Sequence, residues 1–489
     1  SVGIRNRKGK STLFQEMHRT VWQKEPLYGR EIRMGTSKKM SKIQKMIYGL
    51  GDFGSQFIWT FTGSYLTIFY TDIVGLAPAI VSAIMFGARI WDAINDPMFG
   101  TIAERTRTKY GRFRPYILFG TPIMALFCVL TFSAPFGNGT ARVIWATVTY
   151  IGLGMLYTAV NLSYGSLSSV MTTDSEDRIE LNFWRMIGAN VGQLVLNAVS
   201  MPLILFFSAK AQKGTTVATS SGYFYTSFIF AIVTLVLFML VFKNSKEVIA
   251  AGKEEKKIPL KMSVKTIIGN KPLICVFLML MSYCIGLSIH SGLLVYYITY
   301  VVKRLDLATI LMTVPSVCSI LVMFLTKGSI EKVGKKKMLL ISYIGMSVAT
   351  ILLGITDPKN IVLIVIFQGM WGAAKFVSPI LMGSVPECID YAEDKFGTRC
   401  DGIAYSFVSL ATKLGPALGP SIGLLALGSS YVANAEQSAE TLARINFAVN
   451  YLPVVFLLLG IIPVILYPLN KEKNEEIKQR LDKKHAQEN

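Results

Sequence analysis

Apolar segments of about 20 residues recur along the whole chain, and they constrain its fold more than any other feature. Of 489 residues, 52% are hydrophobic and only 16% are charged. A backbone in lipid must satisfy its hydrogen bonds internally, and about 20 apolar residues span a bilayer as a helix. We therefore predict an all-α membrane protein with twelve transmembrane helices. They are expected at roughly 47–72, 78–104, 115–134, 141–164, 183–208, 223–243, 272–301, 307–327, 337–356, 360–383, 402–428 and 446–468.

The positive charge follows the predicted topology. The formal net charge of +20 could suggest a nucleic-acid partner, but the Lys and Arg residues cluster in alternate loops. Bases are dense at 105–114, at 243–271 and at 332–337, whereas 71–77 and 133–140 contain no Lys or Arg. This alternation is the positive-inside pattern. It predicts a multi-pass protein of the cell membrane with both termini cytoplasmic and the basic loops against anionic lipid, and it argues against nucleic acid.

A weak internal repeat divides the predicted helices into two sets of six. Residues 100–112 and 328–337 each begin with Gly, carry an acid three or four residues on, and close with Gly and bases. Six-helix halves related by an axis along the membrane normal are the major facilitator arrangement, with the binding site between the halves. The expected parts are a basic cytoplasmic extension at 1–44, an N-terminal bundle at 45–243, a linker at 244–271, a C-terminal bundle at 272–469 and a cytoplasmic tail at 470–489.

The second predicted span contains the most unusual polar cluster. Residues 91–97 read Trp-Asp-Ala-Ile-Asn-Asp-Pro, so Asp92, Asn95 and Asp96 point to nearly one side of a helix. At 1.5 Å per residue, Asp92 lies roughly 22 Å from the start of the helix, near mid-bilayer. Ionisable groups there are costly and indicate function. Because no lysine adjoins the two acids on this segment, we expect a cation site rather than a buried salt bridge.

Other polar residues inside spans are candidates for substrate binding. Gln56 follows Asp52 by one turn in the first span, and Asp52 is equally well explained as a packing charge near the membrane surface. Tyr157, Thr158 and Asn161 lie together in the fourth span, where Thr158 could offer the cation an oxygen. The remaining candidates are Trp184 and Arg185 at the start of the fifth span and Lys413 in the eleventh.

More than one interpretation stays open for Lys413, for Lys375 and His290, and for a set of charged residues at the predicted cytoplasmic ends. Lys413 could face an anionic substrate or form a salt bridge to Asp92 or Asp96 across the halves. The roles of Lys375 and of the intramembrane His290 stay open. Charged residues at the predicted cytoplasmic ends are either solvated or a gate whose ion pairs break on opening; they are Arg105, Arg112, Glu387, Asp390, Glu393 and Arg399.

Several motifs together resemble the glycoside–pentoside–hexuronide:cation symporters, the sodium- or proton-coupled sugar carriers of the melibiose-permease type. The resemblance covers 46 to about 470 and is carried by the motifs at 48–54, 70–76, 88–97, 111–115, 154–158 and 390–391 and by Arg399. It implies that Asp92 and Asp96 bind the coupling cation with help from Asn95 and Thr158, and Na⁺ is expected beside H⁺. It also matches Lys413 and Arg185 to functional positions of the family.

The predicted sugar site departs from the melibiose pattern. Gln56 and Asn161 stand where that pattern has acids, and Gly165 stands where it has a Trp. Without those acids, Arg185, Lys413 and as a third candidate Lys375 are expected to leave the site more positive, which favours a sugar acid or glycoside with a carboxylate through charge pairing. A neutral pentoside or glycoside fits these residues equally well. The same scaffold could also carry a lipid-like cargo or serve as a non-transporting membrane sensor.

The function implied is symport by alternating access in a monomer, without an organic cofactor. An intramembrane enzyme is not expected, because the chain shows neither the HExxH nor the GxSxG setting of such enzymes.

Overall fold

The computed structural model describes residues 39–488 except for 138, 173, 213–216, 249–266, 398–400, 429 and 434. It divides into a unit Ser1–Met40 and a unit Ser41–Asn489, and all the helices described here belong to the second. The predicted extension therefore falls almost entirely outside the described residues, and its role stays a prediction. The first helix begins at Lys42, three residues before the predicted bundle boundary.

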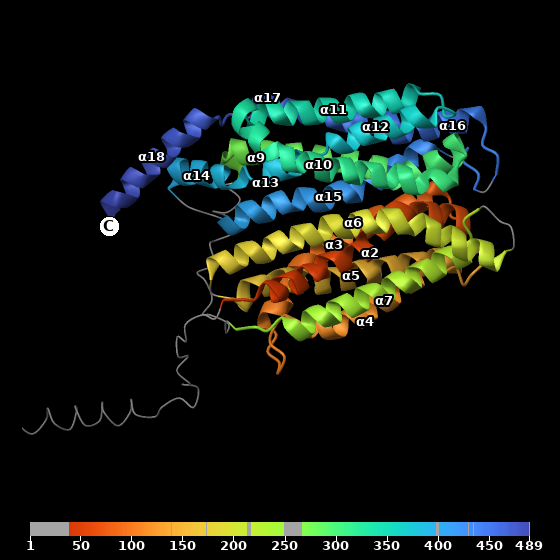
Figure 1. Ribbon diagram of the computed structural model, residues 1–489, viewed down its shortest axis with the longest axis horizontal. Helices are drawn as coiled ribbons and strands as arrows, with labels where there is room; N and C mark the ends of the chain where they lie inside the picture. Colours follow the sequence, from red (N-terminus) through yellow and green to blue (C-terminus); the bar gives the residue numbers. More distant parts are fainter. Residues whose placement is uncertain are drawn as a thin grey trace, which may run out of the picture. The chain divides into compact units, whose positions relative to one another are not determined.

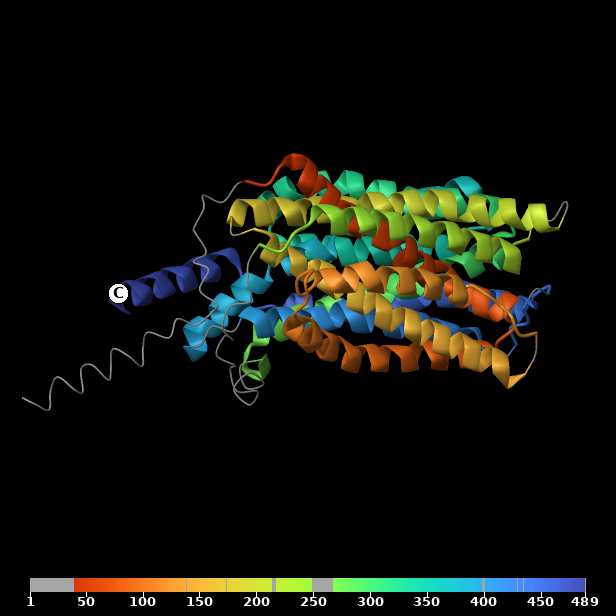
Figure 2. The ribbon, with the colours of Figure 1, turned by 90° about the horizontal axis from the view of Figure 1, so that it is seen from below.

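The N-terminal half consists of six long helices that run along a common direction in both ribbon views (Figures 1 and 2). They are α2 (Lys42–Ile68, extended by a π-helical turn Phe69–Ile73), α3 (Pro78–Arg105), α4 (Arg114–Thr131), α5 (Thr140–Met171), α6 (Ser175–Ala211) and α7 (Ser220–Asn244).

The C-terminal half repeats this plan with more interruptions. Its helices are α9 (Lys271–Tyr296, extended by a π-helical turn Tyr297–Val302), α10 (Ala308–Val333, preceded by a 3₁₀ turn Leu305–Leu307), α11 (Lys335–Ile355), α12 (Ile361–Ala373), α13 (Val377–Met382), α14 (Val385–Phe396), α15 (Asp401–Leu427), α16 (Ala439–Asn446, followed by a π-helical turn Phe447–Tyr451), α17 (Leu452–Leu466) and α18 (Lys471–Glu488).

One sequence expectation in this half is wrong, and two helices appear that the sequence analysis did not specify. The tenth span is not one helix, because α12 and α13 are separated by the non-helical residues 374–376. The charged stretch after it forms helix α14, which buries Val385, Cys388, Ile389 and Ala392 and leaves its acids partly buried. The polar tail also forms a helix, α18, whose Ile477 and Leu481 pack with Leu469, Tyr391 and Tyr467.

Local chemistry explains where the helices start. Ser41 and Gln44 form a reciprocal capping box at the start of α2. Asp174 accepts hydrogen bonds from the backbone N–H groups of Glu176 and Asp177 at the start of α6. Asn270 does the same for Leu273 at the start of α9, and its Nδ2 donates to the carbonyl of Cys388. These caps hold helix ends that would otherwise expose unpaired amides.

Ten helical segments in the described part of the chain are long and apolar enough to cross a membrane. Helices α2 and α3 are as long, but they carry the polar residues described below and are less apolar. The count of twelve crossings therefore stays a prediction. Large apolar side chains are exposed on the outer surface, among them Phe119, Phe206, Val362 and Leu466, as expected for helices that face lipid.

The two halves join at the end where α2 finishes and α3 begins, which we call the opposite end. One apolar cluster runs through both halves there, from Phe61 and Phe69 to Leu293 and Tyr296. Direct hydrogen bonds cross the junction, and they include Thr67 to the Gly292 carbonyl (2.9 Å), Ser82 to the Ser421 carbonyl (2.9 Å) and Asn197 to the Met312 carbonyl (3.1 Å). Asp72 accepts hydrogen bonds from Tyr300 and Tyr431 of the other half.

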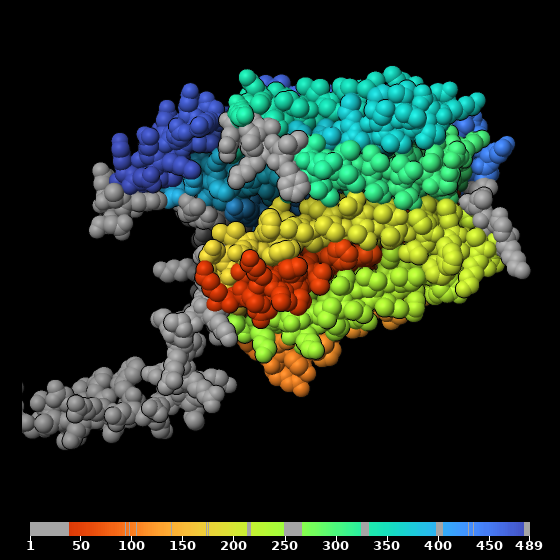
Figure 3. All heavy atoms as spheres, viewed as in Figure 1, coloured from red at the N-terminus to blue at the C-terminus, as the bar shows by residue number. Residues whose placement is uncertain are grey.

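The other end, where α2 begins and α3 finishes, is the basic end. Four ion pairs between described residues there each join residues of one half: Lys45–Asp177, Lys45–Glu180, Lys335–Glu387 and Arg480–Asp394. The C-terminal half also has a separate apolar cluster at this end, which includes Leu273, Val385 and Val464. Figure 3 shows the surface hollowed between α6 (yellow) and the blue helices α14 and α15 on this side.

The chain that leaves α7 is fixed to the N-terminal half. Glu247 accepts hydrogen bonds from the backbone N–H groups of Arg112, Phe113 and Arg114, at 2.9, 2.8 and 3.2 Å. Gly111 adopts a positive φ of 110°, and a Cβ there would come within 2.4 Å of the Glu247 carboxylate, so this turn requires glycine. The next residue, Val248, donates to the carbonyl of Val170 at 2.9 Å.

Candidate functional site

A cavity of about 460 Å³ lies at the junction of the halves, and we call it the site chamber. It is lined from α2, α3, α5, α6 and α15. The lining comprises Asp52, Ser55, Gln56, Trp59, Arg89, Asp92, Asp96, Gly154, Tyr157, Thr158, Asn161, Leu162, Arg185, Leu410, Thr412, Lys413 and Leu414. Its size falls within the range of small-molecule sites, and three carboxylates and three bases are concentrated in it.

Asp92 forms an ion pair within its own helix. Arg89, one turn earlier on α3, places Nη1 3.0 Å from Asp92 Oδ2. The same guanidinium donates to the Tyr150 hydroxyl at 3.0 Å and lies over the Trp59 ring, with Cζ 5.1 Å from the ring centre. A Cβ at Gly154 would come within 3.1 Å of Asp92 Oδ1, so glycine leaves room beside this carboxylate. Arg89 is thereby fully engaged by neighbouring groups.

Asp96 forms an ion pair across the two halves. The Lys413 ammonium of α15 contacts Asp96 Oδ2, and these two side chains are 49% and 11% exposed. A half-exposed lysine in the middle of α15 shows that the chamber opens to solvent. Asp96 Oδ1 is buried and has no hydrogen-bond partner among the described residues. One acceptor of this carboxylate is therefore left for another ligand.

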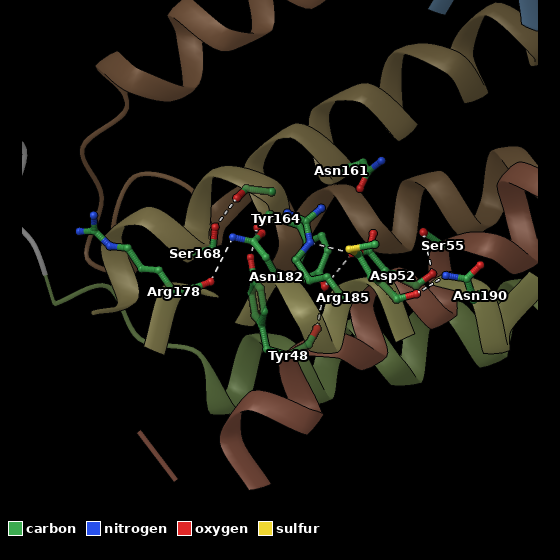
Figure 4. A network of polar contacts seen from close by, with 12 residues as sticks. Tyr48, Asp52, Ser55, Asn161, Tyr164, Ser168, Arg178, Asn182, Arg185 and Asn190 are labelled. Carbon is green, nitrogen blue, oxygen red and sulfur yellow. Dashed lines mark hydrogen bonds and ion pairs between the residues drawn. The ribbon is translucent and has the colours of Figure 1, made fainter. Parts of the chain in front are cut away.

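Asp52 forms the third ion pair, and Figure 4 shows Arg185 extended towards it from α6. Arg185 Nε lies 2.6 Å from Asp52 Oδ2, and the guanidinium also stacks over Tyr164, with Cζ 4.9 Å from the ring centre. The Tyr164 hydroxyl donates to the Tyr48 carbonyl at 2.7 Å. The pair is thus held by two helices that pack closely.

One wall of the chamber is aromatic and carries amide groups. The rings of Trp59 and Tyr157 stack with centres 4.9 Å apart. Asn161 donates to the Tyr157 hydroxyl at 3.2 Å, while its Oδ1 is buried without a hydrogen-bond partner. Gln56 accepts a hydrogen bond from Thr60 at 2.6 Å. An aromatic face beside an amide oxygen that has no partner among the described residues suits a ring that bears hydroxyls.

A second cavity of about 200 Å³, the deep chamber, adjoins the first and shares Trp59, Arg89, Asp92, Gly154 and Tyr157 with it. Each helix that lines both chambers contributes to the deep chamber residues that lie about one turn nearer the opposite end than those it contributes to the site chamber. The C-terminal half adds Leu287, Ser288, Ser291, Gly292, Lys375, Pro416 and Pro420. Lys375 belongs to the break between α12 and α13.

Comparisons with known proteins identify the family. Residues 47–471 match the family described as MFS/sugar transport protein. The chain belongs to this family. The isoprimeverose transporter of Lactiplantibacillus pentosus is 31% identical over 91% of this chain and 92% of that protein. The glucuronide carrier protein homolog of Escherichia coli (strain K12) is 28% identical over 89% of this chain and 94% of that protein.

A solved structure confirms the fold class. The inward open conformation of the xylose transporter XylE from E. coli aligns with a TM-score of 0.60, covering 89% of this chain and 98% of that chain at 14% identity. The protein therefore has the major facilitator fold that the sequence predicts, and it is a membrane transporter of sugars rather than an enzyme.

The structure brings most of the predicted residues into one chamber. Eight of them line it: Gln56, Asp92, Asp96, Tyr157, Thr158, Asn161, Arg185 and Lys413. Asn95 is 1% exposed and lies behind the lining, with a buried Nδ2 that has no hydrogen-bond partner. Trp184 does not line either chamber, and its backbone packs instead beside Gly49. The binding roles of all these residues stay predictions.

Asp92 and Asp96 both form ion pairs in this conformation, and the Asp96 pair is the cross-half salt bridge that was the second interpretation of Lys413, while the cation site stays a prediction. The bases are Arg89, three residues before Asp92, and Lys413 from the other half. The i,i+3 spacing of Arg89 was a signal in the sequence. Trp59 could also have been found, because it follows Gln56 by three residues and shares its helix face.

The predicted gate residues are dispersed at the basic end. Glu387 pairs with Lys335 of its own half, and the backbone N–H of Arg112 binds Glu247. Asp390 and Glu393 lie on α14, and Arg105 is the exposed last residue of α3. Arg399 lies outside the described residues. The gate stays a prediction.

The side chains that line the site chamber offer mainly oxygen atoms as ligands. Among the described residues, no group of three or more His, Cys, Asp or Glu side chains could hold a metal ion. Carboxylate, amide and hydroxyl groups line the same chamber as Asp96, and oxygens of this kind suit a hard monovalent cation.

Proposed function

We propose that the transporter couples the uptake of a sugar or glycoside to Na⁺ or H⁺ by alternating access. The observation that carries this proposal is the cross-half contact between Lys413 and Asp96 inside a chamber open to solvent. A carboxylate that exchanges an internal ammonium for an external cation links ion binding to the junction between the halves.

The coupling ion is proposed to bind at Asp96 and Asp92. In this conformation Lys413 neutralises one oxygen of Asp96, and Arg89 neutralises Asp92. An arriving cation takes the free Asp96 Oδ1 and displaces Lys413, with Thr158 and Asn95 as further oxygen donors. Because the Lys413–Asp96 contact joins the two halves, a cation that displaces Lys413 breaks this link and thereby connects ion binding to movement of the halves.

The sugar is proposed to lie against the aromatic wall. Trp59 offers a ring face, Asn161 Oδ1 offers an unused acceptor, and Gln56 and Arg185 line the same chamber. Binding energy then comes from stacking and from hydroxyl hydrogen bonds, as is usual where a few polar groups orient a ligand in a cleft.

The conformation described here is proposed to face the cytoplasm. The positive-inside pattern of the basic loops supports a cytoplasmic basic end, with both termini on that side and the transporter in the cell membrane. The halves are bonded to each other at the opposite end, whereas the four ion pairs at the basic end stay within one half. We propose a monomer with no organic cofactor and no nucleic-acid partner.

Uptake into proteoliposomes tests this function. The labelled probes are isoprimeverose, methyl β-D-glucoside and methyl β-D-glucuronide, with Na⁺ and proton gradients imposed separately. We expect one gradient to drive accumulation of at least one probe. The variant Asp92→Asn should lose accumulation while downhill exchange continues, because the ion gradient no longer drives concentration of the sugar.

The control is Asp306→Asn, which removes an exposed carboxylate that pairs with Arg304 outside both chambers. It should accumulate the probe as the wild type does. Accumulation by Asp92→Asn against a gradient at the wild-type level would contradict the assigned coupling site.

A further inference from the structure

The break in the tenth span places a base at the junction between the halves. Helix α12 ends at Ala373 and α13 begins at Val377, so the backbone of Lys375 is not helical. The Ser342 hydroxyl of α11 donates to the Ala374 carbonyl and satisfies one group freed by the break. Gly372 lies so close to α10 that a Cβ would come within 2.2 Å of the Pro315 carbonyl oxygen. The break is thus built into the packing, and interrupted helices of this kind form substrate sites in transporters.

Lys375 is the base of the deep chamber that forms no ion pair with any described carboxylate. Its Nζ lies 5.4 Å from the centre of the Trp371 ring, which is a cation–π contact. By contrast, Arg89 in the same lining is engaged by Asp92, Tyr150 and Trp59. An ammonium group inside a membrane protein needs a group that compensates its charge. The cation–π contact with Trp371 stabilises the charge only in part.

The charges of the two chambers do not balance without an anionic ligand. In the site chamber, the described residues form three pairs: Asp52–Arg185, Asp92–Arg89 and Asp96–Lys413. Lys375 adds one positive charge to the deep chamber without a matching acid among the described lining. If a cation displaces Lys413 from Asp96, the site becomes still more positive.

The deep chamber has the size and the donors for a small anionic group. Its volume of about 200 Å³ exceeds the roughly 30 Å³ that one water takes, so it holds a carboxylate or sulfonate with a few waters. Ser288 and Ser291 line it with hydroxyl donors, and the Thr62 hydroxyl is buried there without a hydrogen-bond partner. Trp59 and Tyr157 line both chambers, so a ring stacked on them can direct one substituent towards Lys375.

We infer that Lys375 anchors an anionic substituent of the sugar, a carboxylate or a sulfonate, in the deep chamber. This inference rests on the proposed sugar transport and adds a subsite to it. Of the three bases that the sequence offered for anion selection, Arg185, Lys413 and Lys375, the first two already pair with carboxylates. Lys375 is therefore the residue that sets the preference between anionic and neutral sugars.

Three probes that differ only at carbon 6 test the subsite: methyl β-D-glucuronide, methyl β-D-sulfoquinovoside and methyl β-D-glucoside. Half-saturating concentrations are measured for purified full-length transporter in proteoliposomes. We expect the wild type to bind at least one anionic probe about tenfold more tightly than the glucoside, since one charge-assisted hydrogen bond contributes about that factor. The probe that binds more tightly identifies the carboxylate or the sulfonate as the preferred group.

Substitutions at position 375 then assign the preference. Lys375→Gln should weaken binding of the preferred anionic probe about tenfold and change binding of the glucoside less than about twofold. Lys375→Arg should retain the preference because the charge remains. The matched control is Lys359→Gln, which removes an exposed base just before α12.

The outcomes separate this inference from the proposed function. Accumulation of the glucoside with no preference for either anion would overturn the inference alone, because transport would stand. Equal loss of anionic and neutral binding in Lys375→Gln, in protein with unchanged thermal stability, would also overturn it. Failure of every probe in the wild type under both gradients would overturn the inference together with the proposed function.

Discussion

Asp52 and Arg185 illustrate how this protein keeps charges inside its helices. Their side chains are only 14% and 24% exposed, and each is the other's ion-pair partner. Replacing both residues of a buried ion pair costs less stability than replacing one of them, because the residue that remains is then a buried charge without compensation.

Charge-neutral variants test this pair. Asp52→Asn or Arg185→Gln alone should cost about 2 kcal/mol of stability, at the low end of the range because both groups keep some water. The double variant should recover part of that loss, although sugar uptake falls in all three because both residues line the site chamber. Thermal unfolding in detergent measures the stability. A double variant less stable than both singles would contradict the pairing.

Residue types and spacing predicted which side chains meet, but not how they pair. Helical spacing alone identifies Asp92 and Asp96, and it makes Lys413 a candidate partner for them. The partner of Asp52 was not found, because Arg185 is 133 positions away and reaches it only through the packing of α2 on α6. Lys375 stands out in the sequence as a base in a span, yet its place in a helix break depends on contacts with α10 and α11 that sequence patterns do not contain.

The close packing of helix α2 on helix α6 determines the geometry of the Asp52–Arg185 ion pair. A Cβ on Gly188 would come within 2.1 Å of the Gly49 carbonyl oxygen, and one on Gly192 within 2.7 Å of the Phe53 carbonyl oxygen. Small residues let helices approach in membranes, where no hydrophobic force draws them together. The two helices are therefore spaced by glycine, and Arg185 reaches Asp52 only at that spacing.

Two alanine substitutions isolate this packing effect. Gly188→Ala should destabilise the fold by about 1–3 kcal/mol, because overpacking forces the backbones apart. Gly87→Ala on α3 is the control, since nothing lies within 4 Å of a Cβ there and both changes gain the same helix propensity. We expect a lower thermal midpoint and weaker uptake for Gly188→Ala only. Equal thermal midpoints for the two variants would show that the contact between α2 and α6 at Gly188 tolerates a Cβ, and would contradict this prediction.

Helices were predicted well where their own hydrophobicity specifies them and poorly where tertiary packing specifies them. The long apolar helices lie close to their expected positions, because length and hydropathy alone specify them. Helix α18 was missed because its sequence is polar throughout, and only Ile477 and Leu481 attach it to α14, together with the Arg480–Asp394 pair. Such a short apolar face carries little signal in a sequence.

The distribution of contacts between the halves determines which way the whole molecule opens. Hydrogen bonds such as Ser82 to the Ser421 carbonyl hold the opposite end closed. Asp72 binds Tyr300 and Tyr431 at the same end. A transport cycle by alternating access must break these contacts while it brings the basic ends together.

Cross-linking tests this requirement. In a variant without the six native cysteines, Ser82→Cys and Ser421→Cys together should form a disulfide on oxidation. Uptake should then fall at least about tenfold and recover on reduction, because a locked end keeps the carrier in one state. Each single cysteine serves as the control. Undiminished uptake by fully cross-linked protein would rule out opening at this end.

The anchored start of the segment between the halves bears on how far they can swing. Glu247 and Val248 are tied to the first bundle, and Asn270 is tied to the second through Cys388. The 18 residues at 249–266, which lie outside the described part of the chain, can span at most about 65 Å. We therefore expect that shortening this connection by a few residues leaves turnover intact, because the side chains that meet at each end of the molecule set the amplitude of each stroke.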